Sequence, residues 1–206
     1  MLVLATRNPG KVRELLMLLG DLPLQVRTLD DFPDIPPLEE PGETFEDNAV
    51  LKAALVARLT GEVALADDSG LEIDALGGAP GVRSATFLGP RATDADRNAW
   101  VLERLRDVPA ERRSARYRAV VAVATPQGDV CTFEGRWEGR IADAPRGTGG
   151  FGYDPIFLLP EVGKTVAELS LEEKNRHSHR AQALAAARAC LQALAGRQED
   201  RTDAGN

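Results

Sequence analysis

Short apolar runs that pass directly into polar loops, with helical patterns between them, are the feature that most restricts the fold of this chain. Residues 2–5 are apolar, residues 6–10 are polar, and apolar residues then recur at helical spacing as far as Leu19. A strand expected over residues 63–66 follows closely on a helix expected over residues 45–59. Such alternation is typical of folds in which helices flank a β-sheet. We therefore predict an α/β protein.

A long loop and a helix start are also visible in the first third of the chain. Residues 30–42 are rich in proline and acidic residues and show no periodicity, which predicts a loop of functional length. Thr44 with Asp47 forms an approximate capping box, and Gly61 ends the helix that follows. After the strand at 63–66, residues 67–70 are expected to form a polar turn before a further strand begins at Leu71.

The middle of the chain is expected to form a separate lobe. Two β-rich runs, 114–124 and 128–141, are split by Pro126-Gln127-Gly128, which favours a hairpin. We predict a single two-lobed domain over residues 1–196, with the middle lobe at about 80–142. Residues 197–206 are polar and have nothing to bury, so they are predicted to form a disordered tail.

Composition excludes several classes of partner. The 206 residues include 25 basic and 32 acidic side chains, and the net charge of −7 would repel a nucleic acid polymer. The chain shows neither a leader pattern nor about 18 consecutive apolar residues, so no membrane association is expected.

Cys131 and Cys190 lack metal-ligand spacing, which predicts two reduced core thiols and a cytoplasmic protein.

Lysine is rare, because arginine supplies almost all of the positive charge. The only lysines are Lys11, Lys52, Lys164 and Lys174. An ammonium group is a compact charge that fits between phosphate oxygens, where a planar guanidinium does not fit equally well. The four lysines are therefore either chance survivors or contacts for an anionic ligand.

Two segments combine a lysine with polar neighbours. In Thr6-x-Asn8-x-x-Lys11, a strand ends and a helix begins, so helix N–H groups and an ammonium could hold a phosphate. The alternative is an ordinary capped helix with a solvated lysine. Lys52 interrupts an apolar helix face one turn after Asn48, so its head either reaches water or contacts an anionic ligand.

The acidic candidates are two carboxylate pairs. Asp67-Asp68 is expected at the carboxyl end of a strand, where open α/β sheets bind ligands, and only one of the two can face a given site. Glu39-Glu40 on the long loop could supply a second carboxylate. Two such groups with phosphate oxygens and water are typical of Mg²⁺ binding. Zinc is poorly supported, because His177 and His179 are the only histidines.

Glycines and cationic residues near the C-terminus could surround a ligand. Residues 146–155 contain four glycines around Phe151 and Tyr153, which indicates close approach of the backbone to another group. Residues 174–180 combine Lys174, His179 and Arg180 with neutral donors. They form either a plain basic helix start or a site for an oxo-bearing heterocycle stacked on an aromatic ring.

Taken together, these motifs resemble those of the non-canonical purine nucleoside triphosphate pyrophosphatases, which include inosine/xanthosine triphosphate pyrophosphatase and dITP/XTP pyrophosphatase. Lys11, Lys52 and Lys164 fall within the matching segments, Lys174 lies four residues before the last of them, and these segments lie in order along nearly the whole chain. The matching segments are residues 5–11, 44–53, 66–71, 77–82, 147–155, 163–165 and 178–180.

The resemblance implies Mg²⁺-dependent hydrolysis of ITP, dITP and XTP to the monophosphate and pyrophosphate, which cleanses the nucleotide pool. It also implies a homodimer and a two-lobed mixed β-sheet with flanking helices and a substrate cleft between the lobes. By matching position, the triphosphate would be held by Thr6, Arg7, Asn8, Pro9, Gly10 and Lys11, with Lys52 nearby. Asp68 would be metal ligand and proton acceptor, Glu40 the second metal ligand, and Ser69 a substrate contact. The base would be surrounded by Phe151, Gly152, Tyr153, Asp154, Lys174, His179 and Arg180.

Two other functions remain open at this point. A Maf-type pyrophosphatase acting on dTTP or UTP shares the general architecture, although Ser178-His179-Arg180 argues against it. A nucleotide sensor would bind without hydrolysis, but a binder of triphosphates gains nothing from the paired carboxylates unless they hold a metal.

Overall fold

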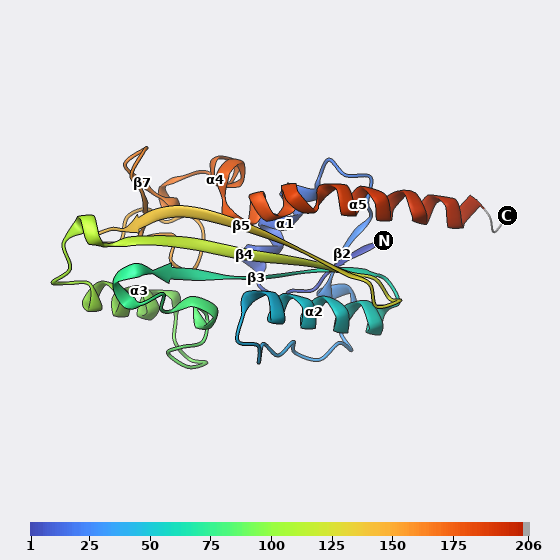
Figure 1. The fold of residues 1–206 in the computed structure, drawn as a ribbon, viewed down its shortest axis with the longest axis horizontal. Helices are drawn as coiled ribbons and strands as arrows, with labels where there is room; N and C mark the ends of the chain where they lie inside the picture. Colours follow the sequence, from blue (N-terminus) through green and yellow to red (C-terminus); the bar gives the residue numbers. More distant parts are fainter. Residues whose placement is uncertain (204–206) are drawn as a thin grey trace. The chain divides into compact units, whose positions relative to one another are not determined.

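Five helices and seven strands make up the computed structural model (Figure 1), which describes the backbone of residues 1–203 and the side chains of residues 1–194. The helices are α1 (Pro9–Leu19), α2 (Phe45–Thr60), α3 (Asp94–Arg104), α4 (Leu171–His177) and α5 (His179–Asp203). The strands are β1 (Leu2–Leu4), β2 (Val26–Thr28), β3 (Val63–Ile73), β4 (Ser114–Ala124), β5 (Val130–Ile141), β6 (Phe157–Leu159) and β7 (Lys164–Thr165).

The strands form one mixed sheet in the order β2-β1-β3-β4-β5-β6-β7. β1 runs parallel to both β2 and β3, whereas β6 runs antiparallel to β5 and β7. The α/β class with a mixed sheet and flanking helices is therefore confirmed.

The chain divides into two compact units. Unit 1 contains residues 1–68, 119–135 and 180–206, and unit 2 contains residues 69–118 and 136–179. These boundaries differ from the predicted middle lobe at 80–142, because β3, β4 and β5 are long strands that contribute residues to both units. The tip of the β4–β5 hairpin therefore belongs to unit 1.

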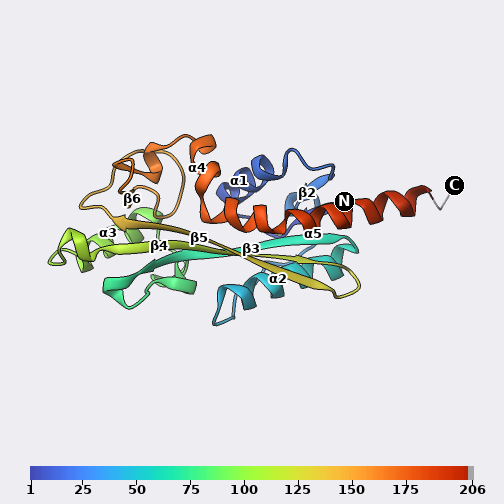
Figure 2. The ribbon, with the colours of Figure 1, turned by 45° about the horizontal axis from the view of Figure 1, so that its top comes forward.

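In unit 1, α1 and α5 cover one face of the sheet and α2 covers the other (Figures 1 and 2). Strand residues alternate between the two faces, so Leu2 and Leu4 pack in the same core cluster as Leu15 of α1 and Leu184 of α5. α2 begins at the cap residue Thr44 and ends at Gly61, whose φ of 70° permits the left-handed turn, as the sequence predicts.

In unit 2, a second core forms around aromatic and aliphatic side chains. Val101 and Leu105, at the end of α3, pack in one cluster with Ile73 of β3 and Trp137 of β5. Tyr117 and Phe157 join this cluster, with ring centroids 4.4 Å apart. This core anchors α3 and the loop that precedes β6.

The prediction of a polar turn at residues 67–70 is wrong. β3 continues through this segment without interruption, and Asp67 and Asp68 lie within the strand rather than at its end. Both residues are buried, and each carboxylate has a hydrogen-bond donor or cationic partner. Because these partners compensate for burial, the two acidic residues do not end the strand.

Two further expectations concern the cysteines and the C-terminus. Neither cysteine forms a disulfide within the described part of the chain, but Cys131 is exposed, so its assignment to the core is wrong. α5 extends past Gly196 to Asp203, and residues 204–206 of the predicted tail lie outside the described residues. Among the described helices, none combines the length and apolar character needed to cross a membrane.

Candidate active site

Asp67 and Asp68 are adjacent in β3 and direct their carboxylates to opposite faces of the sheet. The Asp67 carboxylate contacts Lys11 of α1 and Arg180 of α5, whereas the Asp68 carboxylate contacts Asn48 and Lys52 of α2. This follows from strand geometry, in which neighbouring side chains alternate. One residue step in the sequence therefore produces two different environments.

Asp67 is the centre of a buried ion-pair network. Its carboxylate lies 2.6 Å from the Lys11 ammonium and 3.2 Å from the Nε of Arg180, and Arg180 also pairs with Glu14. Burial raises the pKa of Asp67, but the positive charges of Arg180 and Lys11 outweigh burial and hold that pKa well below its ordinary value. Asp67 therefore stays ionised and fixes the position of Lys11.

Asp68 lies in a different environment, in which the effect of burial on its pKa outweighs the effect of its partners. Asn48 donates a hydrogen bond of 3.0 Å to one oxygen, and the Lys52 ammonium lies 3.6 Å from the other. Burial raises the pKa of Asp68; the charges of Lys52 and Lys11 oppose this, and nearby Glu40 adds to it. A carboxylate with a raised pKa is a better proton acceptor than an ordinary one.

The long loop brings Glu40 to this group. Lys52 donates to the Glu40 carboxylate and also to the backbone carbonyl of Asp67, 2.8 Å away. Asn48 accepts a hydrogen bond of 2.7 Å from the amide of Gly42, which fixes its amide so that the nitrogen faces Asp68. Glu40 is therefore the member of the Glu39-Glu40 pair that contacts Lys52.

We call this group of unit 1 the carboxylate cluster. Its charged side chains, among the described residues, are three cations and four carboxylates: Lys11, Lys52, Arg180, Glu14, Glu40, Asp67 and Asp68. When all are ionised, the carboxylates are in excess, and a triphosphate would add further negative charge. A divalent cation would correct this imbalance, and the oxygens of Glu40 and Asp68 fit Mg²⁺, which needs only one or two carboxylates beside phosphate and water. No cluster of three or more metal-ligating side chains occurs in the described part of the chain.

The segment before α1 combines capping with a lysine directed at the cluster. Asn8 caps the helix, its Oδ1 accepting from the amides of Gly10 at 2.9 Å and Lys11 at 3.1 Å. Thr6 accepts from the amide of Asn8 at 3.2 Å, and Pro9 is the first residue of the helix. Asn8 therefore caps the helix and Lys11 is not a solvated lysine, while contact between this segment and a triphosphate stays a prediction.

The Arg7 side chain points toward the long loop and not toward the carboxylate cluster. Its guanidinium donates to the carbonyl oxygens of Leu29, at 3.3 Å, and Ile35, at 2.8 Å. These contacts hold the start of the long loop, and contact between Arg7 and a triphosphate stays a prediction.

In unit 2, Asp154 contacts two of the predicted base-binding residues and one tyrosine that the sequence did not indicate. Its carboxylate accepts hydrogen bonds from the Lys174 ammonium at 2.6 Å, the Phe151 amide at 3.0 Å and the Tyr117 hydroxyl at 3.0 Å. The Lys174 ammonium also lies 4.7 Å from the centroid of the Phe151 ring. We call these four residues the Asp154 cluster. It presents a half-buried aromatic ring beside a buried ion pair.

Other residues near Asp154 are also held in place by their neighbours. The Tyr153 hydroxyl donates to the carbonyl of Ser84 at 2.6 Å, and His179 stacks on Tyr117 with ring centroids 4.7 Å apart. A Cβ at Gly150 would lie 2.0 Å from an oxygen of Asp154, so only glycine fits there. These contacts hold the loop in the conformation described here.

Comparison with known proteins identifies the family. The Ham1 family model matches residues 2–190. The chain belongs to the Ham1 family.

The relatives cover nearly the whole chain. The chain is 58% identical to a dITP/XTP pyrophosphatase of Thermus thermophilus over 89% of this chain and 88% of that protein. It is 54% identical to the dITP/XTP pyrophosphatase of Geobacter sulfurreducens, over 89% of this chain and 92% of the relative. The structure of the Staphylococcus aureus Ham1 protein matches with a TM-score of 0.81 and 37% identity, covering 93% of this chain and 98% of that one. The family predicted from the motifs is confirmed, and the Maf-type alternative loses its support.

Arg180 occupies a different place in this Ham1-family chain from the one the sequence suggests. The prediction places it around the base, but its guanidinium is buried between Glu14 and Asp67 within unit 1. These contacts make it part of the carboxylate cluster, and contact between Arg180 and a base stays a prediction. Ser69 follows Asp68 within β3, and its contact with substrate also stays a prediction.

Sequence reasoning missed three residues of these clusters as site members. Glu14 stands three residues after Lys11 in α1, a spacing that places both on one helix face. Asn48 shares a face of α2 with Lys52, but the sequence does not indicate its contact with Asp68. Tyr117 lies in an alternating strand pattern that contains nothing to separate it from an ordinary core tyrosine.

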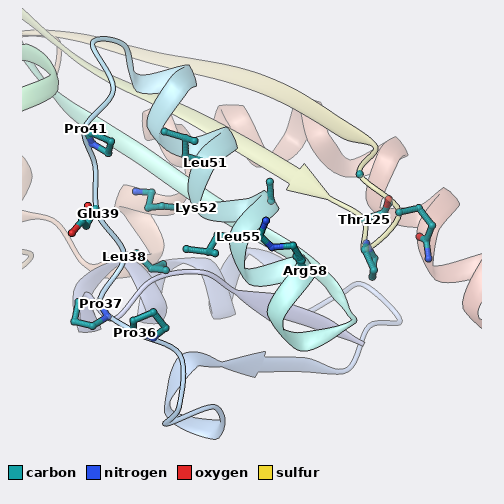
Figure 3. A pocket seen from close by; sticks show the side chains of 14 residues that line it. Pro36, Pro37, Leu38, Glu39, Pro41, Leu51, Lys52, Leu55, Arg58 and Thr125 are labelled. Carbon is teal, nitrogen blue, oxygen red and sulfur yellow. The ribbon is translucent and has the colours of Figure 1, made fainter.

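A cavity of about 670 Å³ lies beside the carboxylate cluster in unit 1 (Figure 3). Its walls are the long loop, the outer face of α2 and the turn at residues 125–128, and most of the lining is apolar. Of the predicted site residues, Lys52 lines it. An apolar cavity of this kind does not suit a triphosphate, so we place the chemistry at the carboxylate cluster instead.

Proposed function

We propose that this protein hydrolyses non-canonical purine nucleoside triphosphates, namely ITP, dITP and XTP, to the monophosphate and pyrophosphate. The observation that carries the proposal is Asp68, a buried carboxylate with a raised pKa that is held by Asn48 and faces Lys52 and Glu40. The activity named for the Thermus and Geobacter relatives supports dITP and XTP as substrates.

The carboxylate cluster is assigned to the triphosphate and to the reaction. A water oxygen attacks the α-phosphorus, and the bond from this phosphorus to the bridging oxygen of the leaving pyrophosphate breaks. Asp68 accepts the proton that the water loses, and Asn48 keeps its carboxylate oriented. Lys11 and Lys52 are donors for the negative charge that develops on pyrophosphate.

Glu40 and Asp68 are the residues that would hold Mg²⁺ in this cluster. When bound, Mg²⁺ supplies positive charge that neutralises phosphate oxygens and favours in-line displacement. Asp67 completes the arrangement by pairing with Lys11 from the opposite face of β3, so that this lysine stays in place before substrate arrives.

The Asp154 cluster is assigned to the base. The half-buried ring of Phe151 offers a stacking surface, and Lys174 with His179 supplies donors suited to a 6-oxo group. An adenine amino group would leave such donors unpaired, and a mismatch of this type costs up to about 10⁴-fold in kcat/KM. GTP also carries a 6-oxo group, so its rejection requires exclusion of the 2-amino group.

The test is to offer the purified protein ITP, dITP, XTP, ATP, GTP and dTTP with Mg²⁺ and to identify the products. We expect monophosphate and pyrophosphate from the first three, with much slower turnover of ATP, GTP and dTTP. Release of single phosphate groups would contradict the proposed bond cleavage. Tight ITP binding without pyrophosphate release would instead identify a nucleotide sensor.

The homodimer and the cytoplasmic location stay predictions. Light scattering on the purified protein, at concentrations used for the activity assay, measures the first directly. A monomer that retains full turnover would show that the proposed chemistry needs only one chain.

A further inference from the structure

Both backbone polar groups of Gly152 are bound by one face of α3. The Gly152 amide donates to the Asp94 carboxylate at 2.7 Å, and the Gly152 carbonyl accepts from the Asn98 side-chain nitrogen at 3.1 Å. Asp94 and Asn98 are four residues apart, so they lie on the same side of the helix. All three residues belong to unit 2.

The helix does not need these contacts for its own formation. Thr93 and Asp96 form the capping box of α3, and Val101 and Leu105 attach the helix end to the core. Asp94 and Asn98 take no part in that capping box, and their contacts with Gly152 reach out of the helix to the loop. Removing these contacts should therefore leave α3 formed.

A buried asparagine at position 98 does not favour the stability of the folded protein. The residue is 5% exposed, and its Oδ1 is a buried acceptor that lacks a partner among the described residues. The amide cannot be reversed, because the Gly152 carbonyl only accepts hydrogen bonds. An unmade acceptor costs free energy. The asparagine thus provides a hydrogen bond to Gly152 despite this cost in free energy.

Gly152 stands between the two aromatic residues of the loop. Its φ of +64° is in the left-handed region, where a side chain would be strained. The residue before it, Phe151, is tied through its amide to Asp154, and the residue after it, Tyr153, is tied through its hydroxyl to Ser84. Fixing the Gly152 backbone therefore fixes, relative to α3, the backbone from which the Phe151 ring projects.

We propose that Asp94 and Asn98 are positioning residues for purine binding, holding Gly152 so that the Phe151 ring is presented to the base. This rests on the proposed function, because it assumes that the loop at 150–154 contacts the purine. The residues act through Gly152 and do not touch the substrate themselves. Their contribution is to substrate affinity, not to cleavage of the α-phosphate.

The test compares Asp94→Ala and Asn98→Leu with the matched control Asp96→Ala. Asp96 is an aspartate in the same helix turn, but it serves the capping box and does not contact Gly152. We measure the Kd for dITP, the KM and kcat for dITP with Mg²⁺, and the Ki for pyrophosphate. Asp94→Asn keeps an acceptor for the Gly152 amide and serves as the conservative rescue.

We expect Asp94→Ala and Asn98→Leu each to raise the Kd and KM for dITP about threefold to tenfold, as loss of the hydrogen bond with Gly152 implies. Asp94→Ala also removes the exposed pair with Arg97 within α3. Their kcat and their Ki for pyrophosphate should stay within about twofold of wild type. Asp96→Ala should lower the melting temperature without changing KM, and Asp94→Asn should restore most of the affinity.

Three results would overturn the proposal: an unchanged Kd and KM in both variants, an equal rise in Asp96→Ala, or a parallel change in kcat and in the pyrophosphate Ki. Failure of the proposed function is distinguishable from these. If wild type binds dITP without cleaving it, the Kd values still decide the role of Asp94 and Asn98. If wild type neither binds nor cleaves dITP, both proposals are wrong.

Discussion

The carboxylate cluster of unit 1 and the Asp154 cluster of unit 2 use buried charge in opposite ways. In unit 1, Lys52 contacts Glu40 and Asp68, and the carboxylates exceed the cations. In unit 2, one buried carboxylate, Asp154, pairs with one ammonium, Lys174, and neutral donors complete its hydrogen bonds. The first arrangement has an excess of carboxylates that a further cation would offset, whereas the second is balanced.

This difference in charge balance supports the proposed division, in which one cluster carries the chemistry and the other binds the base. An excess of carboxylates suits a metal ion and a proton acceptor, both of which act on charged phosphate oxygens. A balanced ion pair beside the Phe151 ring suits a neutral, planar base, because a net charge there would add little to binding. We therefore expect substitutions in unit 1 to change turnover, metal dependence or folding, and substitutions in unit 2 to change substrate affinity.

The largest expected effect is on turnover. Asp68→Asn removes the proton acceptor while keeping its size, so kcat for dITP should fall by about 10²–10⁴-fold. Circular dichroism and the melting temperature should remain near those of wild type. Near-normal turnover would show that the proton acceptor is elsewhere.

The next largest effect is on stability, within the buried part of the same cluster. Arg180→Met leaves Glu14 and Asp67 buried without their shared cation, which should lower the free energy of unfolding by about 3–5 kcal/mol. Urea denaturation measures this. The control is Arg188→Met on the same helix, which breaks a solvent-exposed pair with Asp21 and should change stability little. Equal effects of the two changes would mean that burial of Arg180 does not matter.

A smaller effect is expected on the dependence of activity on Mg²⁺ concentration. This dependence tests which glutamate of the long loop binds the metal. Glu40→Gln should raise the Mg²⁺ concentration for half-maximal activity by roughly tenfold or more, because one carboxylate ligand is lost. Glu39→Gln, at the exposed neighbour, should leave the Mg²⁺ titration unchanged. The reverse result would assign the metal to Glu39.

The smallest effect is expected in unit 2. Phe151→Leu reduces the stacking surface and should raise the KM for dITP about fivefold, with kcat little changed, as expected for loss of about 1 kcal/mol of binding. The same substitution at Phe133, which packs on the core of unit 1, should leave KM unchanged. If Phe151→Leu lowers kcat rather than raising KM, the two clusters do not divide the work as we propose.

The sequence predicts helices and their ends well, because the cues are local. Thr44 and Gly61 mark both ends of α2, and their side-chain and backbone properties act within a few residues. The polar turn at residues 67–70 was wrong for a long-range reason. Asp67 and Asp68 remain in a strand because Lys11, Lys52 and Arg180, remote along the chain, compensate for their burial.

The same reason limits prediction of the carboxylate cluster. The motifs indicate Lys11, Lys52, Asp68 and Glu40 as members, because those residue types suit phosphate and Mg²⁺. The pairing of Arg180 with Glu14 and Asp67 depends on how α1, α5 and β3 pack, and a single sequence does not encode it locally. Tyr117 is likewise recognised only once its hydroxyl is seen at Asp154.

The register of β3 against β1, in which Leu2, Val3 and Leu4 face Val63, Ala64 and Leu65, decides which aspartate serves which purpose. A slip by a single residue would send Asp67 toward α2 and Asp68 toward α1 and α5, exchanging the anchor and the proton acceptor. Insertion or deletion of one residue between Val63 and Asp67 should thus abolish activity even where hydrophobic burial survives. This short stretch of backbone pairing is therefore expected to determine catalysis through the orientation of the two aspartates.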